Sequence, residues 1–154
     1  AERILTILSH VGLDPRRLQI EVTEMLGLRP EPAVYQAFRL LEQQGVRLVL
    51  DDFGTGFSAL SYLRLFPFSK LKLDTIFVQD IFQDARSAAI VRNTIELAVD
   101  LGIAVTAEGV SSPEHYRFLQ AQGCNEVQGY FLGRPCPAED LVLDPLPLCS
   151  FTQV

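Results

Sequence analysis

Two adjacent carboxylates, Asp51 and Asp52, stand at the most chemically informative point of the sequence. They follow the apolar run 48–50 and precede the Phe-Gly-Thr-Gly stretch 53–56. Adjacent strand residues point to opposite faces, so both carboxylates can converge only where the strand breaks into a loop, which the two glycines permit. Two carboxylates held side by side repel each other, which costs free energy unless a cation neutralises them. The segment therefore predicts a strand that ends in a metal or phosphate site, although a solvated Asp-Asp turn that opens a helix also fits it.

The composition is that of a single domain with an ordinary core. Of the 154 residues, 48% are hydrophobic and 21% are charged. Apolar runs stay well short of the ~20 residues of a membrane span, and the amino terminus lacks the order of a signal peptide. We therefore expect a cytoplasmic chain without direct membrane insertion, or the cytoplasmic part of a larger, membrane-anchored protein.

Charge and cysteine content exclude further classes. The net charge of −6 argues against binding a nucleic-acid polymer, whereas a small anionic ligand reached through metal ions remains compatible. Cys124, Cys136 and Cys149 are odd in number and lack Cys-x-x-Cys spacing, so neither a disulfide framework nor a zinc site is expected.

A helix, glycine, strand pattern recurs along the sequence. Amphipathic helices are expected to end at Gly12, Gly45, Gly102 and Gly123, the last beginning at the capping residue Ser112. A further short helix is expected near 58–65. The predicted strands are 18–22, 46–50, 68–73, 103–107 and 125–127. Strands that alternate with helices predict a parallel α/β architecture.

Two parallel folds compete for this pattern. A five-stranded doubly wound sheet would use this number of strands, whereas a (β/α)₈ barrel of the TIM type needs eight strands and about 250 residues. The sequence opens inside a predicted helix with no strand before it. This favours an incomplete barrel, that is, a piece of a larger domain.

Every predicted strand ends in polar residues, and the carboxyl ends of parallel strands are where functional groups gather. In chain order the strand ends carry Glu21 and Glu24, Asp51 and Asp52, Lys72 and Asp74, Glu108, and Gln128. Each has an ordinary explanation alone: Lys72 as an edge lysine, Glu108 as a helix-terminal charge, Gln128 as a turn residue. Five successive coincidences instead favour one convergent acidic site with a lysine. Its oxygen donors suit Mg²⁺, Mn²⁺ or Ca²⁺, and His10 and His115, on helices away from the strand ends, receive no ligand role.

These residues carry a resemblance to a known family. The motifs are Glu-Val-Thr-Glu at 21–24, Asp-Asp-Phe-Gly-Thr-Gly at 51–56, Lys-Leu-Asp at 72–74, Ala-Glu-Gly-Val at 107–110 and Gln-Gly-Tyr at 128–130. In order and spacing they closely resemble the EAL family of cyclic di-GMP phosphodiesterases. The resemblance covers essentially the whole chain. It implies a parallel (β/α) barrel of the TIM type, here an incomplete barrel of about five βα units, with residues 1–154 forming a single partial EAL domain.

The resemblance also implies a metal site. Glu21 and Asp51 would bind a first divalent cation, Mg²⁺ or Mn²⁺, with Asp51 shared and Asp52 reaching a second. Lys72 would hold the attacking water and a phosphate oxygen.

By the same resemblance, Glu108 would sit at the metal and water site, and Gln128 would support that water. Glu24 would be the loop anchor that holds the loop 52–58, which in the family helps to form a homodimer. Phe57 and Ala59 replace a tyrosine and a serine common in that loop, which are small changes.

Two motifs of the family that would precede Ala1 are not in this sequence. The Glu-Ala-Leu motif on the first barrel strand and the following strand with its metal-binding asparagine are absent from this sequence. The chain is therefore expected to be the carboxy-terminal part of an EAL domain that lacks two metal ligands of its own. Its open sheet edges are expected to drive dimerisation or higher self-association.

The preferred function is metal-dependent hydrolysis of cyclic di-GMP, a bacterial second messenger, to linear pGpG, with sensory or diguanylate cyclase-type domains upstream in the parent. One alternative is a catalytically inactive module that binds cyclic di-GMP or a protein partner. Another is a receiver-type phosphorylation domain, which also has an acidic pair and a lysine on five parallel strands. Its phosphoacceptor aspartate should end the strand after the acidic pair, where this chain has Lys72.

Overall fold

The computed structural model describes residues 1–23, 31–54 and 59–141 of the chain. Its helices are α1 (Glu2–Val11), α2 (Pro32–Gln43), α3 (Ala59–Leu65), α4 (Thr75–Gln79), α5 (Ala85–Leu101) and α6 (Pro113–Ala121), with short 3₁₀ turns at Pro15–Arg17 and Ala138–Asp140. Its strands are β1 (Gln19–Thr23), β2 (Arg47–Phe53), β3 (Lys70–Leu73), β4 (Ala104–Ala107) and β5 (Glu126–Val127). None of the helices in this described part of the chain has the length and hydrophobicity that a bilayer crossing requires.

The five strands form one parallel sheet in the order of the sequence, from β1 to β5. A doubly wound sheet reverses its strand order at a switch point, whereas a barrel adds each strand beside the previous one. The order therefore excludes the doubly wound alternative. Within the described residues the sheet is open, because β1 and β5 are its two edges. The predicted fold, an incomplete parallel (β/α) barrel, is confirmed.

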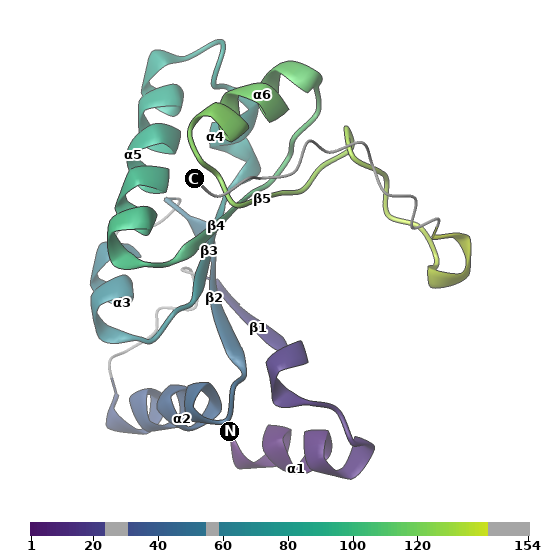
Figure 1. The fold of residues 1–154 in the computed structure, drawn as a ribbon. Coiled ribbons are helices and arrows are strands. Elements are labelled where there is room, and N and C mark those ends of the chain that lie inside the picture. The colour runs from purple at the N-terminus through teal and green to yellow at the C-terminus, as the bar shows by residue number, and fades with distance from the viewer. Residues whose placement is uncertain (24–30, 55–58, 142–154) are drawn as a thin grey trace.

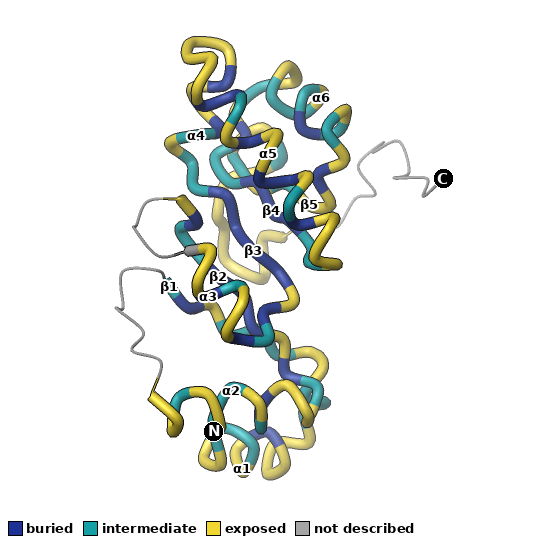
Figure 2. Tube along the Cα trace, turned by 90° about the vertical axis from the view of Figure 1, so that its left-hand side faces the viewer, coloured by how far each residue is buried: buried dark blue, intermediate teal, exposed yellow. Residues whose placement is uncertain are grey.

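One face of the sheet carries the hydrophobic core. In Figure 1 and Figure 2, α3 and α5 lie along this face, and the buried residues follow the strands and the helix sides turned toward them. The packed side chains alternate along the strands and include Leu48, Leu50, Leu71, Leu73 and Val105 of the sheet with Val91, Ile95 and Ala98 of α5. Each fully buried leucine or valine stabilises the fold by about 1.5–3 kcal/mol. Since strand residues alternate, their neighbours in sequence must occupy the other face.

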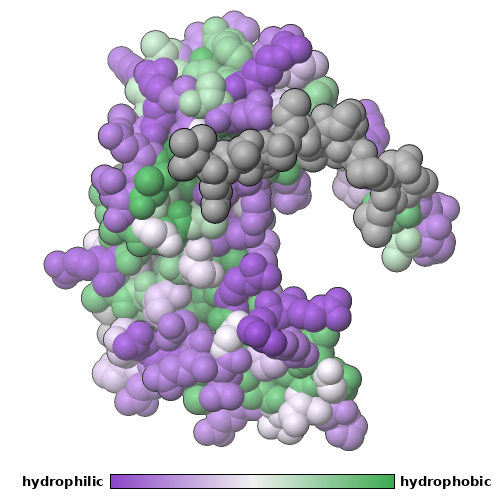
Figure 3. Space-filling model, viewed as in Figure 1, coloured by the Kyte–Doolittle hydropathy of each residue, from purple (hydrophilic) through white to green (hydrophobic). Residues whose placement is uncertain are grey.

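The opposite face of the sheet is polar. It carries the residues that alternate with the core set, namely Glu21, Asp51, Lys70, Lys72, Thr106 and Glu126, which contact one another across the strands. Figure 3 shows the molecule hollowed on this side, with hydrophilic atoms along much of the hollow. Charged side chains on this face, at the carboxyl ends of the strands, can hold a polar ligand.

Helix ends follow the local signals in the sequence. Gly12 and Gly102 adopt the left-handed conformation at the ends of α1 and α5, and Ser112 accepts a hydrogen bond from the backbone N–H of His115 at the start of α6. Helix α4 was not predicted, because five residues are too few to show a helical period. Its cap is Asp74, whose carboxylate accepts the N–H of Ile76 at 2.7 Å.

Candidate active site

The centre of the site is the ammonium group of Lys72 on β3. Its Nζ lies 2.7 Å from Glu108 Oε1, 3.1 Å from Glu21 Oε2 and 3.2 Å from Asp51 Oδ1. The three carboxylates come from β1, β2 and the residue that follows β4, so four neighbouring strands each supply one group. The Lys72 side chain is only 11% exposed. A buried ammonium needs such partners, and their removal would leave an uncompensated charge.

The charge state of Lys72 follows from two opposing effects. Burial favours the neutral amine, but hydrogen bonds to Glu108, Glu21 and Asp51 outweigh burial and raise the pKa of Lys72 above its ordinary value. The side chain is therefore a fixed positive charge near neutral pH. It can stabilise an anion, but it cannot accept a proton.

The strand break that brings the acidic pair together lies at Asp52 itself. The pairing of β2 with β3 shifts register between Leu50 and Phe53, and Asp52 has a positive φ of 55°. Aspartate is among the few residues that tolerate this left-handed conformation. The backbone N–H of Asp52 also donates to Asp51 Oδ1 at 3.0 Å. The sequence predicted a strand over 46–50 that breaks at the carboxylate pair; β2 instead continues to Phe53, with its irregularity at the pair itself.

Negative charge is concentrated around Asp52. The pKa of Asp52 is raised by burial, by the charge of Asp51, and by Asp74, which acts through both its charge and a hydrogen bond. The Lys72 ammonium only partly offsets these effects. Asp74 was recognised in the sequence as a strand-end residue but received no role in the site. The signal that could have placed it there is its position directly after β3.

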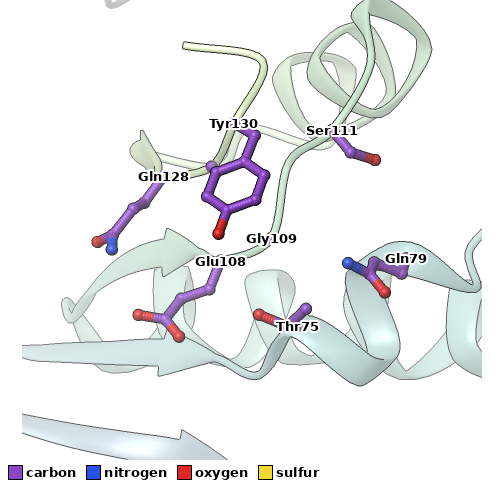
Figure 4. Close-up of a pocket in the computed structure, with 8 residues that line it drawn as sticks. Thr75, Gln79, Glu108, Gly109, Ser111, Gln128 and Tyr130 are labelled. Atoms are coloured by element: carbon purple, nitrogen blue, oxygen red, sulfur yellow. The ribbon is translucent and has the colours of Figure 1, made fainter. Parts of the chain in front are cut away.

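Gln128 lines a cavity beside the carboxylates. The cavity measures about 310 Å³ and is lined by Thr75, Gln79, Glu108, Gly109, Ser111, Gln128, Gly129 and Tyr130. Figure 4 shows Glu108 and Gln128 extending from neighbouring strand ends, with the hydroxyl of Tyr130 directed toward the Glu108 strand end. Because Glu108 also contacts Lys72, it connects the cavity to the acidic centre.

Glycines directly after Glu108 and Gln128 allow the chain to turn sharply beside the cavity. Gly109 has φ 72°, and a Cβ there would lie 2.4 Å from Thr75 Cγ2. A Cβ on Gly129 would lie 2.2 Å from the Val110 carbonyl oxygen. These contacts are too short for any side chain. Steric crowding therefore explains the glycine in each of the two motifs, Glu-Gly-Val and Gln-Gly-Tyr.

The structure brings together most of the residues that the sequence singled out. Glu21, Asp51, Asp52, Lys72 and Glu108 gather at the carboxyl ends of the strands, and Gln128 lies at the adjoining cavity. Glu24, the expected loop anchor, and Phe57 lie outside the described residues. Of the three cysteines, Cys124 is buried and Cys136 exposed, both as free thiols, and Cys149 lies outside the described residues.

The donor set suits a hard divalent cation. Glu21, Asp51 and Glu108 contact the Lys72 ammonium, and the Asp52 carboxylate interacts with its charge. Carboxylate oxygens are the ligands that Mg²⁺ and Mn²⁺ prefer, and the excess of negative charge favours cation binding. As the side chains stand, no three acidic, histidine or cysteine groups among the described residues converge on one metal position. Glu21, Asp51 and Glu108 instead share the lysine.

Fold and site together define a TIM-type (β/α) barrel with an acidic, lysine-containing site at the carboxyl ends of its strands. The EAL domain model matches residues 1–135, and the chain belongs to the EAL domain family. It is 41% identical over 136 residues to MucR of Pseudomonas aeruginosa, a bifunctional diguanylate cyclase/cyclic di-GMP phosphodiesterase, and covers 20% of that protein. That alignment includes 88% of this chain.

Solved structures show the same fold. The MucR phosphodiesterase in complex with c-di-GMP superposes with a TM-score of 0.84 at 39% identity, covering 92% of this chain and 57% of that one. BlrP1 of Klebsiella pneumoniae, in a complex with manganese and cyclic di-GMP, superposes with a TM-score of 0.80 at 36% identity, covering 88% of this chain and 34% of that one. The chain spans 17% to 20% of the length of the first four curated relatives that it matches.

Proposed function

We propose that this chain contributes to a metal-dependent phosphodiesterase site that opens cyclic di-GMP to linear pGpG. The observation that carries the proposal is the contact of one buried ammonium, Lys72, with carboxylates from three other strands. The cyclic di-GMP complexes of the similar proteins MucR and BlrP1 support the choice of ligand, and the manganese in the BlrP1 complex supports a divalent cation. Residues 1–154 would then be part of one EAL domain.

The carboxylates of this chain would hold Mg²⁺ or Mn²⁺. Glu21 and Asp51 would bind one cation, and Asp51 and Asp52 a second. Such a cation, when bound, lowers the pKa of a coordinated water and offsets the charge of the phosphate. The bulge at Asp52 lets both members of the pair serve the same site, since in a regular strand they would point to opposite faces.

Lys72, Glu108 and Gln128 would act on the phosphodiester and the attacking water. Lys72 keeps its charge and stabilises the negative charge that develops on the phosphoryl oxygens. Glu108 accepts the proton of the water, and the Gln128 amide orients it. The water oxygen bonds to phosphorus while the ring P–O3′ bond breaks, and the leaving oxygen takes up a proton from solvent.

The cavity beside Glu108 would accept part of the nucleotide. Tyr130, a residue that is 66% exposed, lines the cavity, and the guanidinium of Arg134 lies 4.7 Å from the centre of its ring. An exposed aromatic ring beside a cation offers a flat surface on which a purine base can stack. The polar side chains of Gln79 and Ser111, which also line the cavity, can hydrogen-bond the base edge.

The test is hydrolysis of cyclic di-GMP by the full-length protein with Mn²⁺ or with EDTA, with nucleotides separated by chromatography. Formation of pGpG that requires Mn²⁺ and is lost in Lys72→Met supports the proposal. Binding of cyclic di-GMP without cleavage in Mn²⁺ would contradict it and indicate an inactive binding module.

We also propose self-association and linkage to other signalling domains. Both edge strands of the described sheet, β1 and β5, have unpaired outer sides, and such edges favour pairing with another strand. The similar protein MucR is a bifunctional diguanylate cyclase/cyclic di-GMP phosphodiesterase, which supports a cyclase-type neighbour in the same polypeptide. Light scattering of the purified protein across a concentration series tests the first of these proposals.

A further inference from the structure

A second charged cluster lies on the polar face of the sheet, beside the proposed site and toward the amino ends of the strands. Lys70 Nζ on β3 lies 2.5 Å from Glu126 Oε2 on β5, and the Thr106 hydroxyl on β4 donates to the same oxygen at 3.0 Å. The Lys70 side chain is 9% exposed and Thr106 is buried, whereas the Glu126 side chain is 51% exposed. Burial disfavours the charged form of Glu126, but hydrogen bonds from Lys70 and Thr106 prevail and lower the pKa of this carboxyl. We call Lys70, Thr106 and Glu126 the floor cluster.

Each member of the floor cluster precedes one residue of the proposed site on the same strand or strand end. Lys70 precedes Lys72 by two residues, Thr106 precedes Glu108 by two, and Glu126 precedes Gln128 by two. Residues two apart on a strand share a face and are separated by roughly 6.6–6.8 Å. The floor cluster thus links, across β3, β4 and β5, the three strands that carry the three proposed catalytic groups.

The positive charge of Lys70 connects the floor cluster to the carboxylates of the proposed site. Among the ion pairs of the described residues, Lys70 takes part in one, with Glu126. Removing the partner of a buried ammonium leaves an uncompensated charge, which favours contact with another carboxylate within its reach. Glu21 is in register with Lys70 across Val49 of β2, and it faces the same side of the sheet as Asp51, where a divalent cation would need both carboxylates.

We propose that the floor cluster positions the metal site: Glu126, oriented by Thr106, retains the Lys70 ammonium at the floor and keeps Glu21 and Asp51 available to a divalent cation. Lys70, Thr106 and Glu126 are positioning residues, because they act through the carboxylates and not on substrate. This inference rests on the proposed metal-dependent function.

Single substitutions at the two charged members should have opposite effects on metal binding. Glu126→Gln leaves Lys70 without its partner, so the ammonium competes with the cation, and the Kd for Mn²⁺ should rise about tenfold. Lys70→Met removes a positive charge beside the site, and the Kd for Mn²⁺ should fall. The double variant lacks both charges and should return to within about twofold of the unmodified protein.

The experiment is calorimetric titration of Mn²⁺ into the full-length protein and its variants, with the melting temperature of each measured in EDTA. The control is Glu42→Gln, which removes one partner of the exposed Arg39–Glu42 pair on α2. Thr106→Val provides a milder change, which loosens Glu126 without removing a charge. It should raise the Kd by less than Glu126→Gln does, and it serves as the test if that variant does not fold.

Two results would overturn the inference. Parallel weakening of Mn²⁺ binding by Glu126→Gln and Lys70→Met would mean that the floor cluster supports only the fold. Unchanged Kd values with lowered melting temperatures would mean the same. If the unmodified protein itself does not bind Mn²⁺, the proposed function fails and the inference fails with it. Mn²⁺ binding that is insensitive to Glu126 and Thr106 refutes the inference alone.

Discussion

The Lys72 ammonium and the Glu108 carboxylate lie 2.7 Å apart across the carboxyl ends of neighbouring strands. Glu108 also lines the cavity that Gln128 and Tyr130 enclose. The pair therefore lies where the acidic centre and the cavity meet. Because Lys72 keeps its proton, any proton transfer at this point must involve the carboxylate and not the amine.

Lys72→Met should reduce kcat of cyclic di-GMP hydrolysis by about 10²-fold or more with a smaller change in KM. The reason is that a fixed positive charge beside the phosphate contributes most when negative charge develops in the transition state. Steady-state kinetics on the full-length protein measure both constants. Arg117→Met on α6, which removes an exposed cation from a surface ion pair, serves as the control and should leave both unchanged. A raised KM with unchanged kcat would reassign Lys72 to substrate binding.

Asp51→Asn should weaken Mn²⁺ binding at least about tenfold, because it removes the carboxylate that both cations would share. The side chain is nearly isosteric, so the fold is expected to persist. Titration calorimetry gives the Kd. Asp100→Asn makes the same chemical change at an exposed position on α5 and should have no effect. Equal Mn²⁺ affinity in the Asp51 variant and the unmodified protein would exclude the proposed ligand set.

Cys124 should resist alkylation in the folded protein, whereas Cys136 should react readily. The Cys124 thiol is 1% exposed and directed at the carbonyl oxygens of Val105 and Glu126, and burial raises its pKa from 9.0 to about 11. At pH 8 it is therefore a neutral thiol, and the thiolate is the reactive form. Iodoacetamide labelling followed by peptide mass spectrometry distinguishes the sites.

The same shift has a consequence for stability. The folded state holds the Cys124 proton more tightly than the unfolded chain does, which contributes to the free energy of unfolding. This stabilising contribution is present below pH 9 and is lost as the pH rises toward 11. Cys124→Ala should remove this part of the alkaline decline in unfolding free energy. Rapid labelling of Cys124 at pH 8 in the native protein would show that the thiol is accessible.

The sequence allowed the site to be predicted because parallel strands end at one edge. Once the strands were recognised, the polar residues that end them, among them Asp51, Lys72 and Glu108, had to lie near one another. The bulge at Asp52 could not be predicted in the same way. It depends on how β2 pairs with β3, and no local signal in the sequence gives the register of that pair.

The floor cluster shows a second limit of the sequence. Lys70 and Glu126 share the sheet face with residues that were recognised, yet each reads alone as an ordinary surface charge. Their contact joins β3 and β5, which are not neighbours, over Thr106 of the strand between them. Pairing at this distance is a property of sheet order and curvature, which only the folded arrangement provides.

Gly109→Ala should destabilise the protein more than Gly102→Ala does, although both glycines have the same backbone conformation. Their φ angles are 72° and 68°, so each alanine costs about 1–2 kcal/mol of unfolding free energy from left-handed strain. A Cβ at Gly102 would meet no atom within 4 Å, whereas one at Gly109 would lie 2.4 Å from Thr75 Cγ2. Overpacking of this kind adds roughly 1–3 kcal/mol.

Urea unfolding of the two variants gives the difference directly, with Gly102→Ala as the matched control for backbone strain. Adding Thr75→Ser to Gly109→Ala removes the methyl group that the new Cβ would strike and should recover part of the loss. Gly109→Ala should also lower the turnover of cyclic di-GMP, since the displaced residue directly follows Glu108. Equal losses of stability in the two single variants would show that the Thr75 side chain moves aside freely, and that the turn after β4 does not fix the position of Glu108.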